Sequence, residues 1–169
     1  MCDSSEIIDR FGSYKSHLIE LLRSFSGDIR CIEFGIGNIS SKIFNDFAKN
    51  NINFEIDSYE FDLKWYQLIK HETYALKNHR FHYVDKYNKI PYNVLLNNKY
   101  DLIFLDQGKD IDGFNNRIYV LNKMINNSKN FMLHNCDLYD INIFKKYAEK
   151  FNMVFFNDIL PPTLLLSRR

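Results

Sequence analysis

The sequence predicts an α/β protein of three layers, in which helices cover both faces of a mostly parallel sheet. Short apolar segments alternate with segments whose apolar residues recur at helical spacing, which is typical of parallel sheets. The continuous apolar run at residues 100–105 indicates a strand that is buried on both faces. The last two strands have no helix between them, so we expect them to form an antiparallel hairpin at the C-terminus.

Each expected element follows from the apolar spacing and from the residues that end it. The first helix covers residues 5–23, and Gly27 ends this unit. The irregular stretch between the strands at 81–84 and 100–105 can contain a short helix near Val94. Strands are expected at 28–35, 54–61, 81–84, 100–105, 130–134, 153–156 and 163–167, and further helices at 40–49, 63–76, 114–125 and 141–151.

Size and composition indicate one cytoplasmic domain with a short N-terminal addition. The 169 residues suit a single core, which we divide into an N-terminal helix at 1–27, as a lid or oligomer contact, and a ligand-binding domain at 28–169. The net charge of +1 gives no electrostatic argument for nucleic acid or a membrane surface as a partner. No apolar stretch approaches the ~18 residues of a membrane helix. The acidic start and three cysteines without metal spacing predict a reducing, cytoplasmic location.

A glycine-containing loop follows the first predicted strand. Gly35 and Gly37 allow a positive φ and let backbone N–H groups approach a ligand closely. Glu60 ends the second strand, where a carboxylate can accept both hydroxyls of a ribose. Ser40 stands where a dinucleotide-binding loop prefers a third glycine, so a nicotinamide cofactor is disfavoured. A ligand-binding loop and a plain strand-to-helix turn both remain open at this point.

The first loop carries a resemblance to a known family. Glu33 precedes the two glycines in Glu33-Phe34-Gly35-Ile36-Gly37, and this motif resembles that of the class I (Rossmann-like) S-adenosyl-L-methionine (SAM)-dependent methyltransferases. Together with Glu60 and the terminal strand pair, the resemblance extends over about residues 28–169. It implies a three-layer Rossmann-like sheet, SAM as the cofactor, and Glu33, Gly35 and Gly37 as part of the cofactor loop.

Three further positions are implied by the same resemblance. Ser41 is placed to bind the methionine carboxylate of SAM, Glu60 to bind the ribose, and Asp85 to lie near the adenine. Asp62 could replace Glu60 in this role, and Asp85 could instead cap the turn that follows it. Ile39 occupies the third glycine position of the longer family motif, a position that varies within the family.

The fourth strand ends at residues that resemble a catalytic pair. Asp106 follows the strand and Lys109 follows within one turn, much as in catechol-type O-methyltransferases, where the aspartate binds a divalent metal and the lysine is the base. By that resemblance Asp106 and Lys109 are catalytic. His134 is an alternative base at the end of the fifth strand, because an imidazole titrates near neutral pH. A structural histidine that is hydrogen-bonded at the strand end is the competing interpretation.

A metal site is the less favoured part of this resemblance. The family supplies adjacent Asp and Asn ligands after the fifth strand, whereas this chain has Asn135 and Asp137 separated by Cys136. Asp106, Asn135 and Asp137 could hold a divalent cation only if the loop bends suitably, since hard cations need several oxygen ligands at fixed geometry.

The sequence thus favours a SAM-dependent methyltransferase that transfers the methyl group to an oxygen of a small-molecule acceptor. No Asn/Asp-Pro-Pro-Tyr motif follows the fourth strand, which argues against methylation of DNA-base amino groups. Because no substrate domain is inserted, either the acceptor is small or residues 7–23 and a second subunit, in a homodimer, form a lid. The alternatives are aminopropyl transfer or SAM cleavage, a non-catalytic SAM-fold module that binds a partner, and a nicotinamide-dependent oxidoreductase.

Overall fold

The computed structural model describes residues 13–72, 76–86, 91, 94–95, 99–108, 110–136, 141–158 and 160–169. Its helices are α2 (Lys15–Ser24), α3 (Ser40–Asn50), α4 (Leu63–Glu72), α6 (Asp110–Met124) and the 3-10 helix η2 (Ile141–Tyr147). Its strands are β1 (Ile29–Phe34), β2 (Phe54–Glu60), β3 (His79–Tyr83), β4 (Tyr100–Leu105), β5 (Ser128–Leu133), β6 (Phe151–Phe156) and β7 (Thr163–Arg168). None of these described helices is long and apolar enough to cross a membrane.

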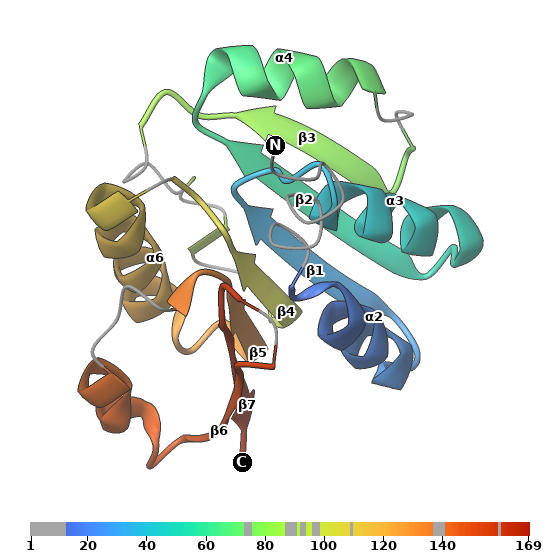
Figure 1. The fold of residues 1–169 in the computed structure, drawn as a ribbon. Helices are drawn as coiled ribbons and strands as arrows, with labels where there is room; N and C mark the ends of the chain where they lie inside the picture. Colours follow the sequence, from blue (N-terminus) through green and yellow to red (C-terminus); the bar gives the residue numbers. More distant parts are fainter. Residues whose placement is uncertain are drawn as a thin grey trace.

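The strands form one seven-stranded sheet in the order β3-β2-β1-β4-β5-β7-β6. Neighbouring strands are parallel from β3 to β5, and β7 is antiparallel to both β5 and β6. The helices α2 and α3 pack against one face, and α6 and η2 against the other (Figure 1). The predicted three-layer architecture and the C-terminal antiparallel hairpin are both confirmed.

The position of β4 in the centre of the sheet explains why its sequence is apolar throughout. Leu102 and Phe104 belong to the buried cluster beneath α2 and α3, whereas Ile103 and Leu105 belong to the cluster beneath α6 and η2. All four side chains are fully buried. A strand covered on both faces has no polar side, so its sequence cannot alternate.

Several predicted boundaries differ from the structure. The helix expected at 141–151 is wrong in its second half, because Phe151 is fully buried and begins β6, where it pairs with Arg168 of β7. The strand β3 begins at His79, two residues before the predicted start. The first helix is described from Lys15 onward, and the predicted residues 5–12 lie outside the described part of the chain.

Candidate functional site

The carboxyl ends of the parallel strands bring the predicted site residues to one edge of the sheet. The strand β1 lies between β2 and β4, so the order of the strands reverses there, and ligands of such sheets bind beyond the strand ends at this point. Backbone hydrogen bonds continue past the strands: Asp106 N–H donates to Phe34 O at 2.8 Å, and His134 N–H donates to Leu105 O at 3.0 Å. Gly35, Asp106 and His134 therefore lie at adjacent strand ends.

Gly35 is the point where the loops after β1 and β4 touch. Its φ is +88°, which glycine adopts without strain, and its N–H donates to Tyr59 O at 2.9 Å. A Cβ at this position would lie 2.5 Å from the carbonyl carbon of Asp106 and the Cα of Gln107. No side chain fits between the two backbones, so the contact requires glycine.

Glu33 fastens the first turn of α3 to β1. Its carboxylate is fully buried and accepts hydrogen bonds from Ser41 Oγ, at 2.9 Å to Oε2, and from Ser40 Oγ. Burial raises the pKa of Glu33 to about 7, although hydrogen bonds from Ser40, Ser58 and Ser41 oppose this shift. Ser41, predicted to bind the cofactor carboxylate, is itself fully buried in this network. Its role toward a cofactor stays a prediction.

Glu60 holds the loop between the two glycines. It is only 6% exposed; its Oε2 accepts the Ile36 N–H at 2.9 Å, and its Oε1 accepts the N–H groups of Phe61 at 2.7 Å and Asp62 at 2.9 Å. A carboxylate offers about four lone-pair sites, so these three bonds leave one acceptor position. Burial raises the pKa of Glu60, and the three backbone amides oppose the rise.

Asp62 and Trp65 have distinct roles after β2. Asp62 Oδ1 accepts the N–H groups of Lys64 at 2.9 Å and Trp65 at 3.0 Å, so it caps the first turn of α4. Trp65 Nε1–H donates to Ile36 O, in the loop after β1. Trp65 is the only tryptophan in the chain and follows Glu60 by five residues, but the abundance of aromatic residues hides it in the sequence.

Asp106 combines partial burial with a buried cation nearby. Its side chain is 19% exposed, and its Oδ1 lies 3.8 Å from Arg117 Nη2. Burial raises the pKa of Asp106 to about 7; Arg117 opposes the rise and the charge of Glu60 adds to it. A carboxyl group that titrates near 7 suits proton transfer at neutral pH.

Arg117 of α6 ties the loops after β4 and β5 together, a role that the sequence analysis missed. Its side chain is 1% exposed and donates to the carbonyl oxygens of Gly108 at 2.8 Å and His134 at 3.1 Å. The sequence contained a signal for this buried position, because Arg117 falls on the helical spacing of the buried residues of α6: Phe114, Val120, Leu121 and Met124.

His134 is buried at the end of β5. Its Nδ1 lies 3.2 Å from Thr163 Oγ1 on β7, and its ring meets the edge of the Tyr14 ring at a centroid distance of 4.5 Å. Burial, with a smaller contribution from Arg117, lowers the pKa of His134 to about 3. The imidazole is therefore a weaker proton acceptor at neutral pH than the Asp106 carboxylate. Its catalytic role stays a prediction.

The structure describes only some of the remaining predicted residues. Asp85 is exposed and lies two residues beyond β3. Asn135 has a φ of +54°, and its Oδ1 is buried without a hydrogen-bond partner among the described residues. Lys109 and Asp137 lie outside the described residues. Within the described part of the chain, no group of three or more His, Cys, Asp or Glu residues could hold a metal ion.

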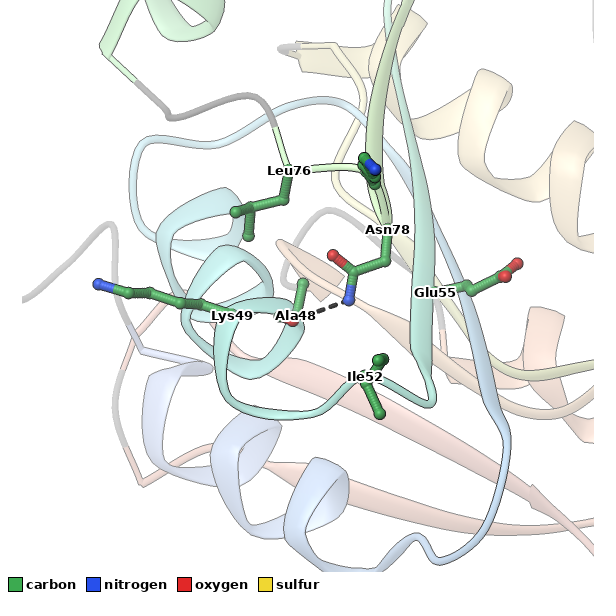
Figure 2. Close-up of a pocket in the computed structure, with 7 residues that line it drawn as sticks. Ala48, Lys49, Ile52, Glu55, Leu76 and Asn78 are labelled. Carbon is green, nitrogen blue, oxygen red and sulfur yellow. Dashed lines mark hydrogen bonds between the residues drawn. The ribbon is translucent and has the colours of Figure 1, made fainter.

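A depression of about 460 Å³ lies at the opposite, amino edge of the sheet (Figure 2). It is lined by residues at the end of α3 and at the starts of β2 and β3: Ala48, Lys49, Ile52, Glu55, Leu76, Lys77 and Asn78. Asn78 Nδ2 donates to Ala48 O at 2.7 Å and to Phe54 O at 2.8 Å, so its amide joins two elements of the fold. The depression is distant from the strand ends that carry the predicted site.

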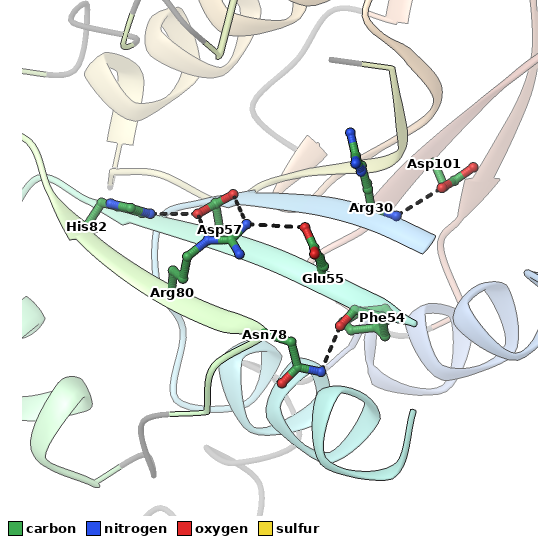
Figure 3. Close-up of polar contacts among 8 residues, drawn as sticks. All are labelled: Arg30, Phe54, Glu55, Asp57, Asn78, Arg80, His82 and Asp101. Carbon is green, nitrogen blue, oxygen red and sulfur yellow. Dashed lines mark hydrogen bonds and ion pairs between the residues drawn. The ribbon is translucent and has the colours of Figure 1, made fainter. Parts of the chain in front are cut away.

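An ion-pair cluster occupies β2 and β3 (Figure 3). Asp57 accepts hydrogen bonds from Arg80 Nε at 2.8 Å and lies 2.7 Å from His82 Nε2. Burial raises the pKa of Asp57, but the hydrogen bonds from Arg80 and His82 outweigh it and hold the pKa below its usual range. These contacts are internal to the two strands and place no group at the carboxyl edge.

Solved structures of methyltransferases share this fold. Human methyltransferase-like protein 13, in complex with S-adenosylhomocysteine (SAH), matches with a TM-score of 0.62 at 16% identity, over 99% of this chain and 83% of that one. SAH-bound PaMTH1 of Podospora anserina matches with a TM-score of 0.63 at 12% identity, over 100% and 82%. The 23S rRNA methyltransferase ErmE matches with a TM-score of 0.59 at 13% identity, over 92% and 68%. No protein-family model and no curated protein matches the sequence.

The chain therefore has the fold of the class I SAM-dependent methyltransferases, as its sequence motifs predict. Two of these three structures contain SAH, the product that SAM leaves after methyl transfer. The third is named as an enzyme that methylates ribosomal RNA, so the fold by itself does not distinguish between small and macromolecular acceptors.

We expect Gly35→Ala to destabilise the protein more than Gly27→Ala. Both glycines have a positive φ, +88° and +78°, so each alanine carries a backbone cost of about 1–2 kcal/mol. Only at Gly35 does the new Cβ also meet backbone at 2.5 Å, whereas nothing lies within 4 Å at Gly27. Overpacking should add about 1–3 kcal/mol to the loss, measured by urea unfolding. Equal losses would show that the loops do not depend on their close contact.

The pH dependence of stability should change in Glu33→Gln. The pKa of Glu33 is about 7 in the folded protein against 4.5 ordinarily, so the folded state retains a proton that the unfolded chain releases. The buried carboxyl therefore lowers the free energy of unfolding progressively as pH rises from 4.5 to 7. Across this window the variant should gain roughly 3 kcal/mol relative to wild type in chemical unfolding. Parallel stability curves would contradict the shifted pKa.

Proposed function

We propose that the protein is a SAM-dependent methyltransferase that methylates an oxygen atom of a small-molecule acceptor. The observation that carries the proposal is the meeting of three groups at the point where strand order reverses: the loop at Gly35, the carboxylate of Glu60 and the carboxyl group of Asp106. The first two suit a nucleoside ligand, and the third suits proton transfer beside it.

The residues at this edge fit SAM as the cofactor. Glu60 retains one acceptor position for a ribose hydroxyl after its three backbone hydrogen bonds. Gln107 Oε1 and Asn135 Oδ1 are buried, and neither has a hydrogen-bond partner among the described residues. Buried oxygens of this kind normally have a donor, so a ligand with donor groups would satisfy them. Cofactor contacts of Ser41 and Asp85 are proposed from the family resemblance alone, since Ser41 is buried against Glu33 and Asp85 is exposed beyond β3.

Asp106 is the proton acceptor that this geometry favours. When bound, SAM would supply a methyl group on a positively charged sulfur, which would retain the electron pair of its bond to carbon as the acceptor oxygen bonds the methyl carbon. The Asp106 carboxylate takes the hydroxyl proton, since its pKa of about 7 leaves a useful fraction ionised at neutral pH. Arg117 holds the loops after β4 and β5 through carbonyl oxygens of Gly108 and His134. Lys109 remains a second proposed proton acceptor, and His134 a third.

The charge of the chain supports a small acceptor. The net charge of +1 lacks the excess of Lys and Arg that binding to a polyanion requires. The proposed role of residues 1–27 is a lid or an oligomer contact. Its described part, α2, packs into the same buried cluster as β1 through Leu18 and Leu22, and Ser13 Oγ donates to Pro161 O at 2.7 Å near β7. This segment can therefore form a fixed wall beside the strand ends.

Isothermal calorimetry with SAH tests the cofactor assignment. We expect wild-type protein to bind SAH, and Glu60→Gln to bind it about 10- to 100-fold more weakly, because a hydrogen bond to a charged group is lost. Glu55→Gln is the matched control: it removes a carboxylate from the exposed, opposite end of the same strand, and it should bind as wild type does. Absence of binding by wild-type protein at high micromolar SAH would overturn the proposed function.

Transfer of labelled methyl groups tests the chemistry and the acceptor. Wild-type protein is incubated with labelled SAM and either a panel of hydroxylated small molecules, total RNA, or no acceptor. We expect label in small molecules, with Asp106→Asn slowed roughly 100- to 10,000-fold. Turnover by wild type should rise with pH through about 7 and level off above it, since the base must be ionised.

The control variant for this experiment is Asp101→Asn, at the other end of β4, where the carboxylate pairs with Lys129 at 2.8 Å. It should retain turnover. Label in RNA alone would show that the acceptor is RNA and not a small molecule. Breakdown of SAM without any acceptor would favour the cleavage alternative. Equal rates in Asp106→Asn and wild type would remove Asp106 as the base.

A further inference from the structure

We infer that Trp65 is a positioning residue of the proposed cofactor loop, whose indole N–H fixes the Ile36 carbonyl group and so holds the backbone of Ile36 in the orientation that bound SAM would meet. The inference rests on the proposed function and adds to it a residue outside the motif that the sequence displays. It is based on the attachment of Trp65 to the start of α4, on the hydrogen bond of its indole N–H, and on the small contribution of its side chain to the core.

Trp65 is held by the start of α4. Asp62 Oδ1 accepts the Trp65 N–H at 3.0 Å, and the Asp62 N–H in turn donates to Glu60 Oε1 at 2.9 Å. The backbone of Trp65 is thus two hydrogen bonds from the carboxylate that we propose to bind the ribose. Asp62 therefore links the Glu60 carboxylate to the first turn of this helix.

Both backbone polar groups of Ile36, which belong to the peptide planes on either side of its Cα, are bonded to this region. The Ile36 N–H donates to Glu60 Oε2 at 2.9 Å, and Ile36 O accepts the Trp65 indole N–H. Glu60, Asp62, Trp65 and Ile36 therefore form a closed ring of hydrogen bonds between the loops after β1 and β2. Because Ile36 lies between Gly35 and Gly37, it is flanked by the least restricted backbone in the chain. The ring supplies the restraint that the glycines lack.

Core packing does not account for Trp65. Its side chain is 38% exposed, and its neighbours Leu63 and Leu68 on α4 are 47% and 49% exposed. Tryptophans are usually well buried, and a partly exposed indole contributes less to stability than a buried one. The hydrogen bond to the loop is the specific contact of its indole N–H. Loss of this bond should change ligand binding more than folding.

Two variants of adjacent residues separate positioning from general packing. Trp65→Phe keeps an aromatic ring but removes the donor to Ile36 O. Tyr66→Phe also removes one donor from α4, but that hydroxyl bonds Phe81 O on β3, at 3.4 Å, away from the loop. We expect Trp65→Phe to bind SAH about three- to ten-fold more weakly, and Tyr66→Phe to match wild type. Thermal unfolding without ligand should be similar in all three proteins.

A double variant and fluorescence test the shared dependence on Ile36. Glu60→Gln and Trp65→Phe act on the same Ile36 unit, so their combined loss of SAH affinity should be smaller than the product of the single losses. Trp65 is the only tryptophan, so its emission, excited where tyrosine does not absorb, should change as SAH saturates wild-type protein.

The possible failures are distinguishable. If wild-type protein does not bind SAH, the proposed function falls and this inference falls with it. If wild type binds SAH but Trp65→Phe binds equally well, only the positioning role of Trp65 is overturned. A multiplicative loss in the double variant, or an emission that saturating SAH leaves unchanged, would also overturn that role and would leave the methyltransferase proposal intact.

Discussion

The close contact of two backbones at Gly35 is the constraint on which the site depends. The loop after β1 rests on the loop after β4 with no space for a side chain, so the ends of the two central strands are held at one distance. The peptide of Ile36 then lies where Glu60 can bond it, and Asp106 is placed next to the same loop. The parallel strands bring the proposed binding group and the proposed proton acceptor to one edge, and a residue without a Cβ lets the loops there meet.

The buried carboxylate of Glu33 provides the second support, and it does so against an electrostatic cost. Removal from water raises the pKa of Glu33 to about 7, and hydroxyl groups of Ser40 and Ser41 compensate only in part. The gain is positional, since those hydroxyls belong to the first turn of α3. The first turn of α3 is thereby attached to β1 by two hydrogen bonds.

The sequence predicted the parts of the structure that depend on local pattern. Residues 100–105 form β4 as expected, because a strand buried on both faces is apolar throughout. The helix expected at 141–151 failed in its second half, because Phe151 continues the helical spacing but pairs with β7. Arg117 and Trp65 were missed because their partners are backbone carbonyl oxygens of distant segments. Such acceptors exist at every residue, so the sequence could show that Arg117 falls on the buried face of α6 but not which atoms it binds.

The bridge formed by Arg117 has a consequence for amino-acid substitutions in the loops that it joins. The guanidinium group recognises carbonyl oxygens at Gly108 and His134, and a carbonyl oxygen is present whatever amino acid occupies the position. The contacts of Arg117 that space the loops after β4 and β5 are therefore made to main-chain atoms and not to side chains. Side chains elsewhere in the two loops can differ without removing these contacts, so the spacing of the strand ends is separable from the surface that the loops offer to a bound molecule.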